Sequence, residues 1–422
     1  MSWVALFILL TGQVPDQPPS TPELPEPPGR PVEFVYRIDI EPSERVAEVQ
    51  LTVKQEGPAL RQLRFHVDPE RHLGFEGDGE LIRSETEEGE IYMAWQVPGG
   101  GGQMRWTSRL DHARDPRSYD ARIATQWAIF RGSDIVPPSS STFGSGSTSS
   151  GRFTIHVPKS WKVVTHHAPI EGRNRSFRLE DADRFFKRPS GWLMLGRLKI
   201  LQFEVGEVDF LLASTRRIGP HLTDIRTFLR LTLPALLKHL DSGPRRITIV
   251  IAGDPMWRGG LSGPGSLYLH ADRPLVASDG TSPLLHELVH VLMEARSGED
   301  GDWIVEGLAE YYALMALYES GGLTEEEKDK AIAGFRKRGQ KAKSLLTDRS
   351  RGDTTAKAVD VLARLDGALA MTAAGGLDVV LAALSQADQP ITTALFEELV
   401  NTAADSDMSA FFEAYVRPRT TR

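Results

Sequence analysis

Apolar and polar residues alternate along much of the chain between residues 32 and 215. The runs VEFVYRIDI, RVAEVQLTV, LRQLRFHV, EIYMAWQV, GRFTIHV and VDFLLAS are short, and turn residues separate them. A period of two puts successive side chains on opposite faces of a strand, so one face can be buried. We therefore predict an N-terminal antiparallel β domain, sandwich-like or saddle-shaped, over residues 32–215. The serine- and glycine-rich stretch SSSTFGSGSTSSG within it is expected to be a loop.

The apolar positions take a helical period from residue 216 onwards, with two strands among the helices. RRITIVIAG and GSLYLHAD are strand-like, whereas PHLTDIRTFLRLTLPALLKHLDSG is a helical pattern that Pro234 is expected to kink or split. TTAKAVDVLARLDGALAMTAAGG and SAFFEAYVR continue the helical pattern towards the end of the chain. We assign residues 216–345 to a second domain and residues 346–422 to a C-terminal helical region, so the fold class is α+β and multidomain.

Helix-capping residues bound two segments in the second domain. TSPLLHELVHVLMEAR is expected to begin its helix at Ser282, a good N-cap residue, with Pro283 at the first helical position. DWIVEGLAEYYALMALYES is expected to be capped by Asp302 and to end at the following pair of glycines. The tripeptide RGD at residues 351–353 is interpreted as the start of another helix rather than as an adhesion motif.

The composition excludes several classes of protein. The chain has 422 residues, of which 49 are basic and 57 acidic, and the resulting net charge of −8 argues against nucleic acid as a partner. There are no cysteines, so disulfides, thiolate nucleophiles and zinc–thiolate sites are excluded. No G-x-S-x-G sequence is present, so a serine-hydrolase nucleophile elbow is not expected.

The first 31 residues combine a short apolar segment with a proline-rich tether. Residues 3–10 are apolar but far shorter than the roughly 20 residues of a membrane-spanning helix, so no transmembrane span is expected. The segment suits a secretory signal, although a basic start and a clean cleavage site are missing; the alternative is a disordered or mis-started N-terminus. We favour export to the periplasm or beyond, with association with the cell envelope.

The sequence HELVH points to a metal site. His286 and His290 are four residues apart and share one face of the predicted helix, so their nitrogens can take adjacent corners of a tetrahedral zinc ion. Glu287 can then act on a water at the ion. Glu306, at the start of the next helix, is the candidate third ligand, and Glu310 on the same face could accept a hydrogen bond from a ligating histidine. Solvated carboxylates on an amphipathic helix are the alternative interpretation of these two glutamates.

HELVH, the 15 residues between His290 and Glu306, and WIVEGLAEYY together resemble the gluzincin metallopeptidases. The chain is most similar to the glycyl-aminopeptidase family, M61, and to its M1 aminopeptidase relatives, and DMSAFFEAYVR resembles the end of the M61 catalytic region. The resemblance implies a thermolysin-like catalytic domain over residues 216–345. It also implies one zinc ion per chain, held by His286, His290 and Glu306, with Glu287 as general base in the hydrolysis of a peptide or protein substrate.

The chain departs from these families at two positions. Relatives have a G-x-M-E-[NH] strand whose acid binds the amino terminus of the substrate, whereas RGGLSGPGSLYLHADRP has no acid there. Relatives also have an oxyanion-stabilising tyrosine three residues before a glycine, where RLDG has Arg364. The candidates for oxyanion or substrate binding are therefore Tyr268, His270, Tyr312 and Arg364. The expected function is a zinc peptidase, and the alternative is a catalytically impaired, zinc-binding scaffold of the cell envelope.

Overall fold

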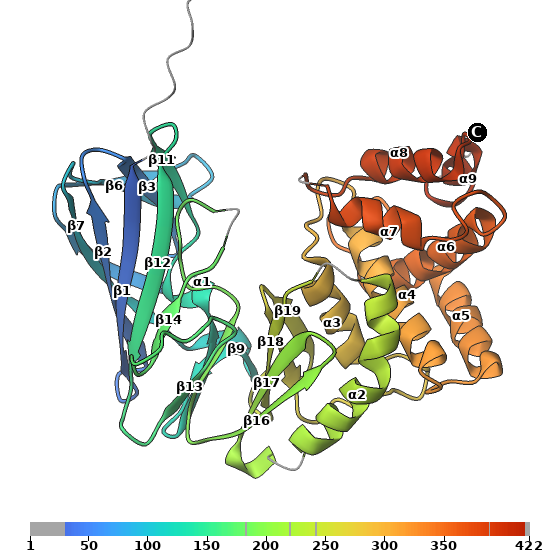
Figure 1. Ribbon diagram of the computed structural model, residues 1–422, viewed down its shortest axis with the longest axis horizontal. Helices are drawn as coiled ribbons and strands as arrows, with labels where there is room; N and C mark the ends of the chain where they lie inside the picture. Colours follow the sequence, from blue (N-terminus) through green and yellow to red (C-terminus); the bar gives the residue numbers. More distant parts are fainter. Residues whose placement is uncertain (1–29, 182–183, 219–220, 241–242, 388, 418–422) are drawn as a thin grey trace, which may run out of the picture.

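Two sheets packed face to face form the first part of the protein, at the left of Figure 1. The computed structural model describes residues 30–417 except 182–183, 219–220, 241–242 and 388. In β1, Phe34, Tyr36 and Ile38 are buried, as the period of two predicts. The predicted N-terminal antiparallel β domain is thus confirmed, although β1 and β12 pair in parallel.

The larger sheet has the order β14-β12-β1-β2-β7-β4 and the smaller one the order β11-β3-β6-β5. Their strands are β1 (Pro31–Glu41), β2 (Val46–Gln55), β3 (Leu60–Val67), β4 (His72–Gly77), β5 (Glu80–Glu85), β6 (Ile91–Gln96), β7 (Gly101–Arg109), β11 (Ser139–Phe143), β12 (Thr148–His156) and β14 (Ser176–Arg178). The prediction of a loop for the serine-rich stretch is therefore wrong in part, because this stretch forms β11 and the start of β12. Pairing with β3 and β1 satisfies its backbone groups despite the weak side-chain pattern.

A third sheet connects the β domain to the rest of the chain. Its order is β13-β15-β10-β9-β8, and Trp192 and Met194 on β15 pack against Val250 and Tyr268 of the following sheet. Its elements are β8 (His112–Asp115), β9 (Ser118–Ile123), β10 (Trp127–Arg131), β13 (Lys162–Val164) and β15 (Trp192–Gly196), with the short helix α1 (Gly132–Ile135) after β10. The two parts of the molecule therefore share a buried apolar contact.

The second part is built on a mixed sheet of order β16-β17-β18-β20-β19. Its strands are β16 (Leu198–Val205), β17 (Val208–Thr215), β18 (Arg246–Ala252), β19 (Gly260–Gly263) and β20 (Ser266–His270). β17, β18 and β20 are parallel neighbours, whereas β16 and β19 are antiparallel edge strands. The expected domain boundary at residue 215 falls inside this sheet, because β17 is hydrogen-bonded to β18 rather than to a strand of the β domain.

Helices cover the mixed sheet and then form the C-terminal part of the molecule, as predicted (Figure 1). They are α2 (His221–His239), α3 (Pro283–Met293), α4 (Asp302–Glu319), α5 (Glu325–Gly339), α6 (Asp353–Leu369), α7 (Asp378–Ser385), α8 (Thr393–Ala404) and α9 (Ser409–Tyr415). α2 is not split at Pro234. Ser282 caps α3 through its side chain, as expected. Asp302, however, is the first residue of α4 rather than its N-cap, and its carboxylate accepts a hydrogen bond from Ser350 N.

Among the described residues, no helix is long and apolar enough to cross a membrane. The apolar segment at residues 3–10, on which the export prediction rests, lies outside the described residues.

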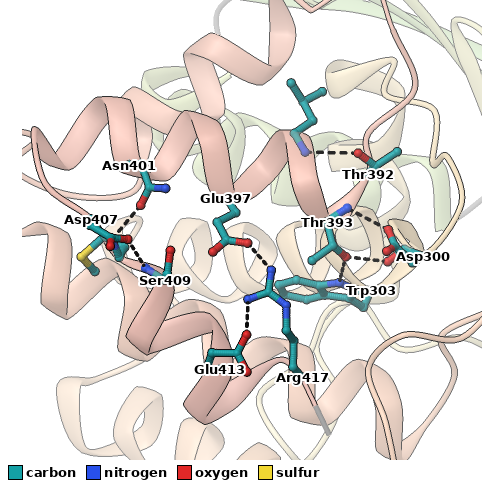
Figure 2. Close-up of polar contacts among 12 residues, drawn as sticks. Asp300, Trp303, Thr392, Thr393, Glu397, Asn401, Asp407, Ser409, Glu413 and Arg417 are labelled. Carbon is teal, nitrogen blue, oxygen red and sulfur yellow. Dashed lines mark hydrogen bonds and ion pairs between the residues drawn. The ribbon is translucent and has the colours of Figure 1, made fainter.

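The C-terminal helices are fixed to the start of α4 by buried polar contacts, shown in Figure 2. Trp303 is fully buried, and its Nε1 donates a hydrogen bond to Thr393 Oγ1 at 3.0 Å. The same hydroxyl donates to the backbone oxygen of Asp300, and Asp300 Oδ1 accepts from Thr393 N. One turn further along α8, Glu397 pairs with Arg417, which also pairs with Glu413 of α9.

Thr393→Val should lower the free energy of unfolding by about 1–3 kcal/mol, because it leaves the buried Trp303 Nε1 without an acceptor. Glu413→Ala, which removes an exposed partner of Arg417, is the control and should have a smaller effect. Urea unfolding of both variants measures the difference. Equal midpoints for Thr393→Val and the unmodified protein would contradict this account of how α8 is held.

Candidate metal centre

Helices α3 and α4 bring two histidines and two glutamates together inside the second part of the protein. His286 Nε2 lies 3.2 Å from His290 Nε2, and the Glu306 carboxylate oxygens lie 3.5 Å from each of these nitrogens. Within the part of the chain that the structure describes, these three residues are the one group whose donor atoms could hold a metal ion, all within 4.8 Å of one another. Local helix geometry explains the histidine pair, and the packing of α4 on α3 adds the carboxylate.

The arrangement fits zinc. Zinc takes nitrogen donors at about 2.0–2.1 Å and oxygen donors at about 2.0–2.2 Å in a tetrahedron, so neighbouring donors lie about 3.3 Å apart. The separation of 3.2 Å between the two histidine nitrogens matches this value, and the Glu306 carboxylate has one oxygen 3.5 Å from His286 Nε2 and the other 3.5 Å from His290 Nε2. Two imidazole nitrogens and one carboxylate oxygen are also a donor set of catalytic rather than structural zinc sites, since three protein ligands leave a fourth position open.

Glu310 lies one helical turn after Glu306 and contacts the opposite side of the His286 ring. Its Oε2 is 2.9 Å from His286 Nδ1, the nitrogen that faces away from His290. Burial lowers the pKa of His286, but the carboxylates of Glu306 and Glu310 outweigh burial and raise it to about 10. Burial and the charge of His286 lower the pKa of His290 to about 4. The two partly buried carboxylates therefore favour positive charge between the two rings, which a divalent cation supplies.

Glu287 lies beside the histidines and against the edge strand β19. Burial, together with the charge of Glu306, raises the pKa of its carboxyl group, whereas the charge of His286 and hydrogen bonds from Ser262 oppose this shift. A β-carbon at Gly260 would come within 2.7 Å of Glu287 Cγ, so this position needs glycine. The edge strand thus approaches Glu287 closely and holds its carboxylate through Ser262.

A cavity of about 800 Å³ opens over these residues. The metal-centre residues His286, Glu287, His290 and Glu306 all contribute to its wall. The other lining residues include Arg114, Trp257, Leu261, Ser262, Arg296, Val305, Ser350 and Arg351. On balance, the pKa of Glu306 is lowered: burial raises it, and the positive charges of the histidines and of Arg351 outweigh that effect. The cavity therefore joins the candidate metal centre to a group of arginines.

The β domain supplies one wall of this cavity. Tyr119 on β9 exchanges two backbone hydrogen bonds with the loop before β19, donating to Pro255 O at 3.0 Å and accepting from Trp257 N at 2.9 Å. Arg114 on β8 stacks over the Trp257 ring, with 3.8 Å between its guanidinium carbon and the ring centroid, and pairs with Asp120. The cavity is thus formed between the β domain and the helices.

Tyr268 and His270 on β20 do not line the cavity. Leu267 and Leu269 face the helical core, so the period of two turns the intervening residues towards the β domain. Tyr268 is buried there, and its hydroxyl donates to Trp257 O at 2.8 Å. His270 is fully buried, and its Nδ1 accepts a hydrogen bond from Asp272 N. The structure therefore does not bring these two candidates to the metal centre.

Tyr312 and Arg364 also lie elsewhere. The Tyr312 hydroxyl donates to Asp378 Oδ1 at 2.9 Å, which places it between α4 and α7. The Arg364 guanidinium donates to Asp360 on its own helix. Neither residue is part of the cavity wall. The oxyanion role expected for one of these four residues thus has no support in the geometry.

The three arginines of the cavity are not among the site residues predicted from the sequence. Arg351 belongs to the tripeptide interpreted only as a helix start, and Arg296 follows the HELVH helix directly. Arg114 comes from the β domain, far away along the chain. The proximity of Arg296 to the HELVH motif in the sequence could have suggested this residue. The convergence of all three arginines, however, depends on the tertiary fold.

Solved structures with a similar fold are zinc aminopeptidases and their relatives. An aminopeptidase N family protein from Idiomarina loihiensis aligns with a TM-score of 0.68 and 15% identity over 92% of this chain and 76% of that one. An M1 zinc metallopeptidase from Deinococcus radiodurans, solved with a Tyr-Ser-Ala substrate, has a TM-score of 0.61 and 14% identity over 94% and 95% of the two chains. Yeast LTA4 hydrolase has a TM-score of 0.60 and 12% identity over 92% and 68%.

The chain therefore has the fold of the M1 aminopeptidases, with an N-terminal β domain and C-terminal helices. No protein-family model matches the sequence, and a search of curated proteins finds no match. The predicted gluzincin relationship is supported at the level of the M1 fold, whereas the assignment to family M61 stays a prediction.

Purified protein should bind about one zinc ion per chain, because two imidazoles and one carboxylate form an open three-donor site. His290→Ala and Glu306→Ala should each lose most of this zinc, as measured by elemental analysis after dialysis. His221→Ala, which removes an exposed histidine outside the site, is the control and should keep it. Full zinc content in both site variants would reject this donor set.

Glu310→Ala should weaken zinc binding by roughly 10- to 100-fold, because it removes the carboxylate that orients His286. Glu310→Gln retains an oxygen acceptor and should lose less. A competition titration with a zinc-chelating dye measures both affinities. If Glu310→Ala binds zinc as tightly as the unmodified protein, the contact with His286 does not support the metal.

Proposed function

We propose that the protein is a zinc-dependent metallopeptidase. His286, His290 and Glu306 hold the ion, Glu310 orients His286, and Glu287 is the general base. The observation that carries the proposal is the convergence of two imidazole nitrogens and a carboxylate, with donor atoms within 4.8 Å of one another, beside a non-ligating carboxylate on the wall of the same cavity. A purely structural zinc site has four protein ligands and no use for Glu287.

When bound, zinc supplies a Lewis acid that polarises the carbonyl of the scissile bond and acidifies water. Glu287 takes a proton from the attacking water and delivers it to the nitrogen of the leaving amine. Ser262 keeps the Glu287 carboxylate on the cavity side of β19 through its hydrogen bonds. His286 and His290 stay in register because both are on α3, which Ser282 caps.

The proposal includes a thermolysin-like catalytic domain around the mixed sheet and the α3–α4 pair, with membership of family M61 as the finer assignment. Peptides or proteins are the proposed substrates; the Deinococcus radiodurans relative was solved with such a peptide. Export to the periplasm and association with the cell envelope remain predictions from the N-terminal sequence alone.

The cavity differs from that of an aminopeptidase in its acidic groups. Glu287 and Glu306 are the carboxylates among the described lining residues, and both belong to the metal centre. The edge strand β19, where relatives have an acid for the amino terminus of the substrate, instead places Ser262 on Glu287. We therefore propose that hydrolysis does not depend on a free amino terminus.

Glu287→Gln should keep bound zinc and lose peptide hydrolysis by about 10²- to 10⁴-fold, because the amide retains size but cannot accept the proton. The assay is digestion of a mixed peptide library, with zinc content measured on the same samples. Glu326→Gln, an exposed glutamate at the start of α5, is the matched control and should keep full activity.

If the unmodified, fully zinc-loaded protein cleaves no peptide in the library, the peptidase proposal is wrong. The alternative, a zinc-binding scaffold that has lost catalysis, would then account for the preserved donor set.

A further inference from the structure

The cavity beside the metal centre carries more positive than negative side chains. Its lining includes three arginines, Arg114, Arg296 and Arg351, and two carboxylates, Glu287 and Glu306. A bound divalent cation contributes two positive charges and the carboxylates two negative ones, so these four charges cancel. Arg114 is compensated by its own ion pair with Asp120, so two guanidinium charges, those of Arg296 and Arg351, remain on the cavity wall, in a protein whose net charge is −8.

Two of these arginines have no carboxylate partner. In the segments that the structure describes, neither Arg296 nor Arg351 forms an ion pair, whereas Arg114 pairs with Asp120 at 3.1 Å. Arg258, by contrast, pairs with Asp254. Like charges that converge on one cavity repel each other, and a bound anion relieves that repulsion.

The backbone around each free guanidinium is anchored. Arg296 O accepts a hydrogen bond from Ile391 N at 2.8 Å, and Gly298 N donates to Ile391 O at 2.8 Å. Ser350, the residue before Arg351, is buried and donates through its N–H to Asp302 on α4. Two different segments are thus fixed where Arg296 and Arg351, both exposed, line the cavity that contains Glu306.

We propose that this arginine-lined cleft binds a carboxylate of the peptide substrate, through Arg296 and Arg351. The choice of a peptide as the ligand rests on the proposed peptidase function. Guanidinium groups are suited to carboxylates because their planar donors match the two carboxylate oxygens. The carboxylate has two sources in a peptide, an acidic side chain or the C-terminus, and both have the same chemistry.

Binding to the zinc-loaded Glu287→Gln protein tests the cleft without turnover. The probes are N-acetylated alanine hexapeptides with one phenylalanine. One further position holds either glutamate or glutamine, and the C-terminus is either free or amidated, which gives four forms. The glutamate is moved through each position in turn. Calorimetry should show a preference of about 10- to 100-fold for one carboxylate over its neutral counterpart, the range expected for hydrogen bonds to a charged group. The preferred form identifies the source.

Arg296→Gln and Arg351→Gln, introduced singly and together into the Glu287→Gln protein, should reduce this preference to near parity while binding of the neutral peptide changes little. Arg349→Gln removes the same charge from an exposed position on the same loop, outside the cavity wall, and is the matched control. Zinc content is measured for every variant, so loss of the metal centre is recognised separately.

The inference is overturned if no probe binds, if carboxylate and neutral peptides bind equally, or if the double variant keeps the preference. Cleavage by the unmodified protein is measured in parallel with the same peptides. Cleavage without a carboxylate preference would leave the peptidase proposal intact and reject this one. A carboxylate preference that depends on the arginines, without cleavage by the unmodified protein, would support the cleft and reject the peptidase.

Discussion

The partial burial of two carboxylates and two imidazoles between α3 and α4 is the constraint on which the rest of this structure depends. Charged groups taken out of water are stable only where opposite charges and hydrogen bonds compensate them. Here the compensation requires Glu306 and Glu310 to stay within 3.5 Å of the histidine nitrogens. Because a shift of α4 along α3 would break these contacts, the surrounding packing has to fix the two helices relative to each other.

Contacts on several sides of α4 meet this requirement. Next to Glu306, Gly307 lets α6 approach so closely that a β-carbon would lie 2.8 Å from Ala358 Cβ. One turn earlier, Trp303 is fully buried against Phe396 of α8. The C-terminal helices α6 and α8 therefore pack against α4 around Glu306. This packing fixes the position of α4, although the candidate donors themselves come only from α3 and α4.

The parts of the centre that follow local rules could be predicted from the sequence. The histidine spacing and the Ser282 cap depend on neighbouring residues alone, and the predicted donors do converge. Tyr268 shows the limit of such reasoning. The strand period places Tyr268 and Leu267 on opposite faces, but only the packing of sheets and helices decides which face meets the metal centre.

The arginines of the cavity show the same limit, because the sequence around each of them does not indicate that they converge. The candidate donors and Glu287 lie on α3 and α4, whereas Arg296 and Arg351 lie on loops that other contacts anchor to this core. A loop residue can change while the helices keep their spacing, because no donor of the metal centre depends on its side chain. In a protein with this fold, the charge of the cavity beside Arg296 and Arg351 can therefore change while the spacing of the candidate donors on α3 and α4 is kept.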